Sequence, residues 1–274
     1  MVKLDNTGLA RPHTGLVDAD LVYVEQVEWG LTRLAAMFNR KVPKVVGPVR
    51  SARISDLEIL KQFSAPGLVF SGANNVLLKQ ISASNAVSLS PTEKGEYFYR
   101  NNKKEVPHNQ MLELADMIAK TKGLGVVSDI GLIFDREIPA GGTPAKTFKA
   151  TWPSSIISGT WSKKGWAISV DGYVQKDYVT KQPVIARTVI IQFVEQTDSE
   201  QGDRFGGKTP LSRTVGEGTA VILRNGQRFA ATWSRPIATA GTSYLVGGFP
   251  FSLDVGQVWI LLVNEKKMAS VTIK

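Results

Sequence analysis

Hydrophobic and polar residues alternate along parts of the first half of the chain in the way that strands require. Residues 21–28 alternate and are rich in β-branched side chains, and residues 67–72 form a short apolar run that ends in a glycine turn. Both segments are predicted to be strands. Residues 31–38, beyond the break at Gly30, fit either a strand or a helix, because their periodicity does not distinguish the two.

Helical spacing occurs at three other places in this half. Apolar residues recur from Ile54 to Phe63, residues 75–81 follow a predicted strand as a short helix would, and residues 110–122 place apolar side chains on one helical face. Asn109 is the predicted N-cap of the third helix. The first half is therefore predicted to mix helices and strands.

The pattern changes at residues 138–144, which are rich in glycine and proline. Residues 196–212 are polar and glycine-rich and are predicted to form a mobile loop. The other segments of the second half show strand patterns, at 147–152, 155–161, 166–173, 184–195, 218–223, 229–233, 242–245 and 258–263. We therefore predict an α+β protein, with a mixed α/β N-terminal domain over residues 1–141 and a mainly β C-terminal domain over residues 142–274.

Composition narrows the kinds of site that the chain can form. Its 274 residues are 43% hydrophobic and 21% charged, which suits one large or two ordinary globular domains. The absence of cysteine excludes disulfides and thiolate metal sites, and two histidines are too few for a histidine-rich metal site. No run of 18 apolar residues predicts a membrane-spanning helix. We expect neither a metal nor a cofactor.

The chain is basic, and most of the excess lies in its second half. The formal net charge is +9; residues 1–141 hold 17 Lys and Arg against 15 Asp and Glu, or +2, and residues 142–274 hold 16 against 9, or +7. Such an excess favours an anionic partner, such as nucleic acid, anionic lipid or an anionic wall polymer. A solvated basic surface without a partner is the commoner explanation of an excess of this size.

One stretch, residues 44–53, brings candidate chemistry to a predicted helix start. Gly47-Pro48 breaks the chain, Ser51 can cap the following helix, and Arg50 and Arg53 lie three residues apart. Free backbone N–H groups and two guanidinium groups would then converge on a spot that suits a phosphate or a carboxylate.

Two alternatives to this interpretation stay open. Ser55, with Glu58 three residues later, is a second choice for the helix cap. Both arginines could also be structural, pairing with Asp56, Glu25 or Glu28 to fix a loop.

Three further residues are candidates for the same cleft. Glu25, Glu28 and Arg33 flank the break at Gly30, and a glutamate among valines and a tyrosine in a strand is unusual. Their simpler interpretation is surface charge. His108 lies just before the third predicted helix, where a neutral imidazole is favoured. A lone histidine is as often structural as catalytic in such a setting.

The stronger catalytic signatures are absent. The sequence contains no phosphate-binding loop, no Gly-x-Ser-x-Gly elbow, no His-Glu-x-x-His helix and no dinucleotide fingerprint. Residues 206–209 resemble the end of a phosphate loop, but the upstream glycine at the required spacing is missing. Five of the six tryptophans lie in the second half, where core packing is a more common use than stacking on a ligand.

Several short motifs together resemble the YerB family of bacterial lipoproteins. The most specific is the string Gly47-Pro48-Val49-Arg50-Ser51-Ala52-Arg53. The others are Asp5-Asn6, Arg11-Pro12, Val22-Tyr23-Val24-Glu25, Thr32-Arg33, Tyr99-Arg100, Pro107-His108-Asn109, Gly216-Glu217-Gly218, Asn225-Gly226, Thr232-Trp233-Ser234 and Gly256-Gln257-Val258-Trp259-Ile260. The sequence departs from the family at Trp29-Gly30, where a glycine pair is usual, and follows it only loosely over residues 173–187.

The resemblance implies a location more than a chemistry, because the family has no settled biochemical activity. Its members resemble exported proteins tethered by a lipidated cysteine, so the membrane anchor and signal peptide are expected to lie outside this chain. The expected localisation is extracytoplasmic, as a membrane-anchored lipoprotein of the bacterial cell envelope.

Two functions follow as hypotheses, and the sequence does not decide between them. The first is a hydrolase or transferase acting on a phosphate- or carboxylate-bearing envelope substrate, with Glu25 or Glu28 as general base and His108 as general acid. The second is a non-catalytic module that binds an anionic envelope polymer or a partner protein; nucleic acid is not a favoured partner. The predicted ligand-binding residues are Arg33, Arg50, Ser51, Arg53, Arg100 and Asn109.

Overall fold

One large sheet runs through both halves of the chain. The structure is a computed structural model that describes residues 1–126, 129–203 and 206–274. The sheet has twelve strands. In spatial order they are β21 (Phe249–Pro250), β20 (Ser243–Val246), β19 (Gln227–Arg235), β18 (Gly216–Arg224), β15 (Thr188–Val194), β23 (Val258–Asn264), β2 (Leu21–Gln26), β3 (Thr32–Met37), β1 (Val2–Asp5), β4 (Gly67–Val69) and β5 (Val87–Leu89), while β9 (Thr143–Pro144) pairs with β19.

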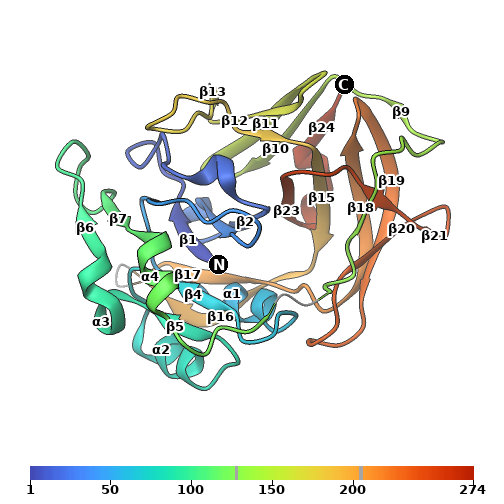
Figure 1. The fold of residues 1–274 in the computed structure, drawn as a ribbon. Helices are drawn as coiled ribbons and strands as arrows, with labels where there is room; N and C mark the ends of the chain where they lie inside the picture. The colour runs from blue at the N-terminus through green and yellow to red at the C-terminus, as the bar shows by residue number, and fades with distance from the viewer. Residues whose placement is uncertain (127–128, 204–205) are drawn as a thin grey trace.

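The two halves of the chain meet where β2 pairs with β23. The two strands run parallel, with Leu21 opposite Val258 and Val24 opposite Leu261 (Figure 1). On its other side β23 runs parallel to β15. Both β15 and β23 are buried along almost their whole length, as is typical of central parallel strands covered on both faces.

A second, six-stranded sheet covers one face of the large sheet. Its strands are β13 (Tyr173–Val174), β12 (Gly165–Val170), β11 (Ser155–Ser162), β10 (Thr147–Trp152) and β24 (Val271–Ile273) in spatial order, with β14 (Ile185–Ala186) paired to β12. In β10 buried and exposed residues alternate, because only one face of this sheet meets the core. Phe148 and Trp166 pack in one cluster with Val22 and Leu34 of the large sheet.

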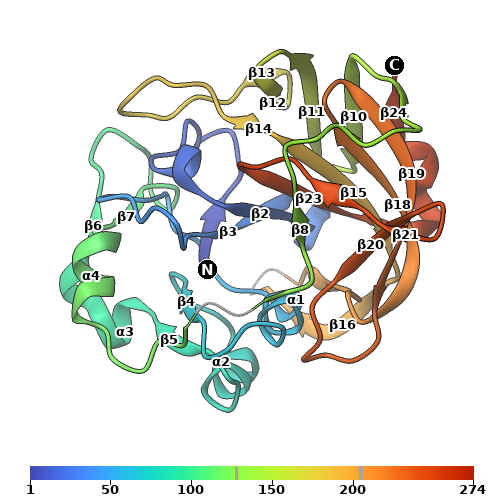
Figure 2. The ribbon, with the colours of Figure 1, turned by 45° about the vertical axis from the view of Figure 1, so that its right-hand side comes forward.

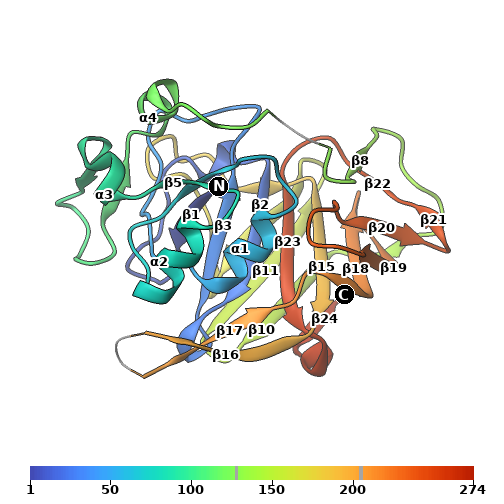
Figure 3. The same cartoon turned by 90° about the horizontal axis from the view of Figure 1, so that it is seen from below.

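Two helices, α1 (Ile54–Leu60) and α2 (Asn75–Ser82), lie against the opposite face near β1–β3 (Figure 3). Leu57 of α1 and Leu77 of α2 share a core cluster with Tyr23 and Ala35. The remaining elements are α3 (Pro91–Lys94), α4 (Leu114–Lys120), the 3-10 helices η1 (Leu16–Asp18), η2 (Glu28–Gly30), η3 (Gly95–Tyr97) and η4 (Glu265–Ser270), and the strand pairs β6 (Phe98–Arg100) with β7 (Gln110–Leu112), β16 (Gln196–Gly202) with β17 (Lys208–Ser212), and β8 (Ile133–Phe134) with β22 (Ser252–Leu253).

The predicted fold class is confirmed. The four α-helices of the described residues all lie between Ile54 and Lys120, and beyond residue 142 the described chain is mainly strands. The open choice for residues 31–38 is settled in favour of a strand, β3. The boundary between residues 141 and 142 stays a prediction. Figure 2 shows the strands of the first half continuing into those of the second half.

Two predicted elements are wrong. Residues 110–122 do not form one helix: Gln110–Leu112 pair with Phe98–Arg100, and α4 begins only at Leu114. The apolar side chains Met111 and Leu112 are buried in this hairpin, so tertiary pairing overrides the helical spacing. Asn109 is therefore not a helix cap.

The second error concerns the predicted mobile loop at 196–212. Its described parts form the β16–β17 hairpin, while residues 204–205 lie outside the described residues. The hairpin reaches across to η2 and α1 in the first half, where Thr209 and Ser212 are buried. Its polar residues are partners of other polar groups, which is why the segment resembles a loop in sequence.

Within the described ranges no helix is long and apolar enough to cross a membrane.

Most tryptophans of the second half are used for packing, since Trp166 and Trp259 are fully buried and Trp152 and Trp233 nearly so. The exposed tryptophan, with 61% of its surface accessible, is Trp29 of η2.

Candidate functional site

Three neighbouring strands place charged side chains on one face at one end of the large sheet. Side chains alternate along a strand, so Lys3 and Asp5 of β1 point to the same face. The register sets Arg33 of β3 opposite Asp5 on one side and opposite Glu25 of β2 on the other. We call these four residues, together with the charged groups that contact them from α1 and η2, the polar end of the sheet.

A fully buried ion cluster lies at the centre of the polar end. Lys3 Nζ is 2.7 Å from Asp56 Oδ1 and also pairs with Glu25, and all three side chains are inaccessible to solvent. Burial lowers the pKa of Lys3 to about 8, and the Asp56 charge limits that fall. Buried charges are tolerated only when they are paired, so these groups hold α1 against the sheet.

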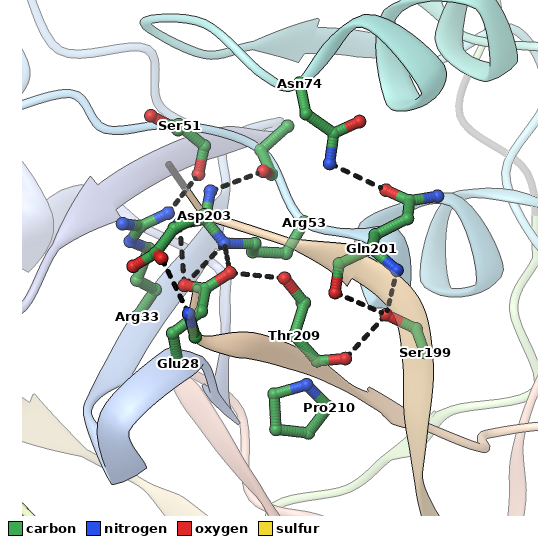
Figure 4. A network of polar contacts seen from close by, with 12 residues as sticks. Glu28, Arg33, Ser51, Arg53, Asn74, Ser199, Gln201, Asp203, Thr209 and Pro210 are labelled. Atoms are coloured by element: carbon green, nitrogen blue, oxygen red, sulfur yellow. Dashed lines mark hydrogen bonds and ion pairs between the residues drawn. The ribbon is translucent and has the colours of Figure 1, made fainter. Parts of the chain in front are cut away.

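Glu28 and Arg53 form a second ion pair beside this cluster. Arg53 Nη2 donates to Glu28 Oε2 at 2.7 Å, and the Thr209 hydroxyl donates to Glu28 Oε1 (Figure 4). Burial acts to raise the pKa of Glu28, but the hydrogen bonds and charge of Arg53 outweigh it and the pKa is lowered. This pair links η2, the start of α1 and β17.

The start of α1 differs from the prediction. Arg53 is the N-cap residue, and its N–H donates to Asp56 Oδ2 at 2.6 Å. Ser51 does not cap the helix; its carbonyl accepts a hydrogen bond from Arg33 Nη1 at 2.8 Å. Ser55 does not cap it either, because its hydroxyl accepts the Ser212 N–H of β17 at 3.0 Å. The predicted meeting of free helix N–H groups with two guanidinium groups is therefore not present.

Gly47 explains part of the sequence motif. Its φ is +151°, and a Cβ atom there would lie 2.9 Å from the Gln110 carbonyl oxygen. A larger residue would push the chain away from β7. The following residues then run along β1, where the Arg50 N–H donates to the Lys3 carbonyl at 2.8 Å.

Asp5 brings Arg50 and His108 together at the outer edge of the polar end. Asp5 Oδ2 lies 2.7 Å from His108 Nδ1 and 3.1 Å from Arg50 Nε, and Asp5 Oδ1 accepts the Thr7 N–H at 3.0 Å. Burial acts to raise the pKa of Asp5, but these partners outweigh it and the pKa is lowered. Asp5 is thus a buried carboxylate that orients two cationic or ionisable groups.

The far atoms of those two groups are open. The Arg50 and His108 side chains are 26% and 16% exposed, whereas Asp5 is 2% exposed. Among the described residues, no protein group forms a hydrogen bond with His108 Nε2 or with the terminal nitrogens of Arg50. We call Asp5, Arg50 and His108 the Asp5 corner.

Arg100 and Asn109 support the hairpin that carries His108. Arg100 Nη1 donates to Asn109 Oδ1 at 2.8 Å, and Asn109 Nδ2 donates to the carbonyls of Asn101 and Lys104 at 3.3 and 3.2 Å. These contacts fix the loop between β6 and β7, from which His108 reaches Asp5.

Arg33 is enclosed by this network. Burial, with the nearby Arg53 charge, lowers the pKa of Arg33 to about 9, which leaves the group protonated at neutral pH. Its charge lies between the Glu25 and Asp5 positions of the neighbouring strands.

The predicted residues therefore fall into connected groups rather than one open cleft. Arg50 and His108 meet at the Asp5 corner, Glu28 and Arg53 are joined in a half-closed pair, and Glu25 is sealed in the core. The prediction of a general base at Glu25 or Glu28 gains no support from these contacts, because neither carboxylate faces solvent. The structural alternative for the arginines gains support at Arg53. No group of three or more His, Asp or Glu residues in the described part of the chain could hold a metal ion.

Sequence reasoning missed the partners in this network. Lys3, Asp5 and Thr209 were not candidate site residues, although the alternation Val2-Lys3-Leu4-Asp5 sets two charges on one face of a strand. Charged residues on a face that is otherwise apolar are the signal that identifies such a pair.

Comparisons with known proteins agree with this architecture. Residues 1–127 match the family described as "Protein of unknown function (DUF3048) N-terminal domain", and residues 154–260 match its C-terminal domain. The Bacillus subtilis (strain 168) protein named "Putative lipoprotein YerB" is 24% identical over 285 residues, which cover 99% of this chain and 82% of that protein. The crystal structure of YerB protein from Bacillus subtilis has a TM-score of 0.83 at 22% identity, covering 100% of this chain and 92% of that one.

The structural match supports the fold, and the two family matches support the order of the N- and C-terminal parts. The resemblance inferred from the sequence motifs is confirmed. This chain belongs to the YerB-like family, and it matches both the DUF3048 N-terminal domain and the DUF3048 C-terminal domain.

Proposed function

We propose that this chain is the extracytoplasmic part of an envelope lipoprotein and that it binds an anionic ligand at the Asp5 corner. The observation that carries the proposal is the arrangement of Arg50 and His108, which are held by one buried carboxylate while their outer nitrogens stay free in the described structure. The location follows the name of the Bacillus subtilis relative, "Putative lipoprotein YerB".

The corner offers donors of the kind that an oxyanion needs. Asp5 Oδ2 and the Thr7 hydroxyl both contact His108 Nδ1, so Nε2 is the ring nitrogen left for a ligand. Arg50 uses Nε for Asp5 and keeps its terminal nitrogens for a ligand. An imidazole that carries a proton on Nε2 donates from that atom, so an anion next to both groups can accept hydrogen bonds from His108 and from Arg50. A phosphate or carboxylate group fits this donor set.

Binding is favoured over chemistry because the other charges are neutralised internally. Glu25 and Glu28 are paired with Lys3 and Arg53, so they are not available as bases at the surface. The polar end thus provides a rigid support, and the Asp5 corner provides the open donors.

The test is anion-dependent thermal stability. Sulfate or phosphate should raise the melting temperature relative to chloride at equal ionic strength, because a ligand that binds the folded state stabilises it by mass action. Arg50→Lys keeps the charge but loses the fork of donors, so the stabilisation should fall while folding is retained. Arg228→Lys, at an exposed arginine of β19 that belongs to neither the Asp5 corner nor its surroundings, is the matched control. Undiminished stabilisation of Arg50→Lys would refute the proposal.

A second candidate is a hydrolase or transferase in which His108 is the base. The Asp5–His108 pair favours it, because a carboxylate on Nδ1 orients an imidazole for proton transfer at Nε2. Turnover of a nitrophenyl phosphate ester by the wild type, with loss in His108→Gln, would support this function. Anion binding without turnover would instead support the non-catalytic binding module.

A further inference from the structure

A large apolar cavity lies at the other end of β1–β3, away from the polar end. Its volume is about 760 Å³, which lies within the range of roughly 300–1,000 Å³ found for small-molecule sites. Met1, Leu21 and Met37 line it from the strand ends, and Leu114 and Ile118 line it from α4. The same three strands thus end in charged groups on one side and in an apolar hollow on the other.

The outer wall of the cavity is a strap, which we define as residues 124–126 and 129–134. Leu132 and Phe134 of the strap line the cavity. The Gly125 N–H donates to the Ala65 carbonyl at 2.8 Å, and the Asp135 N–H, just beyond the strap, donates to the Leu253 carbonyl at 2.9 Å.

A buried arginine also anchors the far end of the strap. Arg224 is 0% exposed, and its Nη2 donates to the carbonyls of Asp135 and Glu137 at 2.6 and 2.5 Å. These bonds tie the chain at Gly125 and just beyond Phe134 to the rest of the protein. The hollow is therefore built into the fold, because both sides of it are tied to the core.

The mouth of the cavity is polar and carries a cation. Arg40 lies there with Asp20 and Asn39. Asp20 Oδ2 already accepts the N–H groups of Asn39 and Arg40 at 2.8 and 2.9 Å, and Arg40 Nε lies 3.3 Å from Asp20 Oδ1. Among the described residues the terminal nitrogens of Arg40 have no hydrogen-bond partner, so they can meet an anionic group outside the apolar hollow.

We propose that the cavity binds a single-chain anionic amphiphile, with the alkyl chain inside and the anionic head at Arg40. The apolar lining excludes a polar or sugar-like ligand from the interior, and the exposed guanidinium selects a carboxylate or phosphate head. This site is separate from the Asp5 corner and does not depend on the function proposed for it. Two sources supply such a ligand: a free fatty acid has a carboxylate head, and a lysophospholipid has a phosphate head.

The first experiment is a calorimetric titration of the whole chain with octanoate, decanoate and dodecanoate below their micelle concentrations, and with lysophosphatidylglycerol. Affinity should rise about fourfold for each added methylene, the effect of burying one more CH₂ group. Preference for the fatty acid or for the lysolipid identifies the source. If none of these fatty acids and lysolipids binds saturably, the proposal is wrong.

Variants then locate the site. Leu132→Trp should fill the hollow and reduce dodecanoate affinity at least tenfold, while Val179→Trp, at a site 67% exposed and outside the cavity, should leave it unchanged. Arg40→Gln should lower the affinity for every anionic amphiphile. The increase in affinity for each added methylene should stay the same. Arg50→Lys should have no effect here. Equal affinity of Leu132→Trp and the wild type, with both melting normally, would overturn the assignment.

Discussion

At the scale of single residues, Lys3 shows how much the polar end depends on one cation. Replacing Lys3 by methionine leaves Glu25 and Asp56 buried without their partner. Breaking a buried ion pair in this way costs about 3–5 kcal/mol, so the free energy of unfolding in urea should fall by that amount.

Lys41 provides the matched control for this prediction. It pairs with Asp18 at 2.8 Å but is 63% exposed, so Lys41→Met should cost at most about 1 kcal/mol. Adding Glu25→Gln to Lys3→Met should restore part of the loss. Similar small losses at Lys3 and Lys41 would show that the buried cluster does not hold the fold together.

The burial of His13 makes the stability of the folded protein depend on pH and fixes the sign of that dependence. Burial lowers its pKa to about 4, although its hydrogen bond with the Asp5 carbonyl opposes that fall. The unfolded chain takes up this proton near pH 6.5. Between pH 6.5 and pH 4 the unfolded state therefore binds more protons, and stability falls as the pH falls.

The measurement is urea unfolding of the wild type and His13→Gln at several pH values. The variant lacks the group, so its stability should depend less on pH between 6.5 and 4, by about 3 kcal/mol over the whole interval. Asp5 and Glu28 have lowered pKa values, so their stabilisation is lost progressively from the pH at which free carboxyls titrate downward, and the wild type and the variant share that loss. Identical pH profiles of the two proteins would exclude this role for His13.

The residues of the site were only partly predictable. The motif with Arg50 and Arg53 stood out because its arginines are close in sequence, and His108 stood out because histidine is rare in this chain. Asp5 was missed as the group that joins them, because it is separated from His108 by 103 positions. Sequence spacing does not reveal a contact that the sheet register creates.

At the scale of elements, strands were predicted well where one face is buried or where the run is apolar throughout. The turns Asp171-Gly172 and Asn225-Gly226 have positive φ at both positions, as hairpin turns of this type require. The β16–β17 hairpin was missed because its polar side chains bond to the first half of the chain, which the pattern cannot show.

The strap anchor gives a prediction at this scale. Arg224→Met removes the hydrogen bonds to the Asp135 and Glu137 carbonyls, so the chain around the exposed Arg136 should open more often. Trypsin should then cleave after Arg136 severalfold faster than in the wild type. Arg228→Met, which loses a bond to the Thr143 hydroxyl, is the control. Equal rates in the three proteins would mean that Arg224 does not restrain this segment.

At the scale of the whole molecule, the positive charge is concentrated in one half of the chain, whereas both halves form the large sheet. The +7 excess lies in residues 142–274, whereas the large sheet joins both halves through β2 and β23. The change in sequence pattern near residue 140 predicted the mixed first half and the mainly β second half. The parallel pairing of β2 with β23 did not, because a contact between strands so far apart leaves no periodic signal.

The charge excess predicts weak, salt-sensitive attraction to anionic surfaces. Binding to vesicles rich in phosphatidylglycerol should be measurable at low salt and should fall steeply near physiological ionic strength, where exposed charges are screened over about 8–10 Å. Co-sedimentation at several salt concentrations tests this. Tight binding that is insensitive to salt would indicate a shaped lipid site in place of a charged surface.

The most direct test of the anion-binding account is the imidazole signal of His108 in nitrogen-15 NMR. The chain has two histidines, and His13 is buried and serves as an internal reference. Titration with phosphate at constant ionic strength should move the His108 signals, Nε2 above all, along a saturable curve and leave those of His13 in place. Unchanged His108 signals up to high phosphate, or equal shifts at both histidines, would contradict binding at the Asp5 corner.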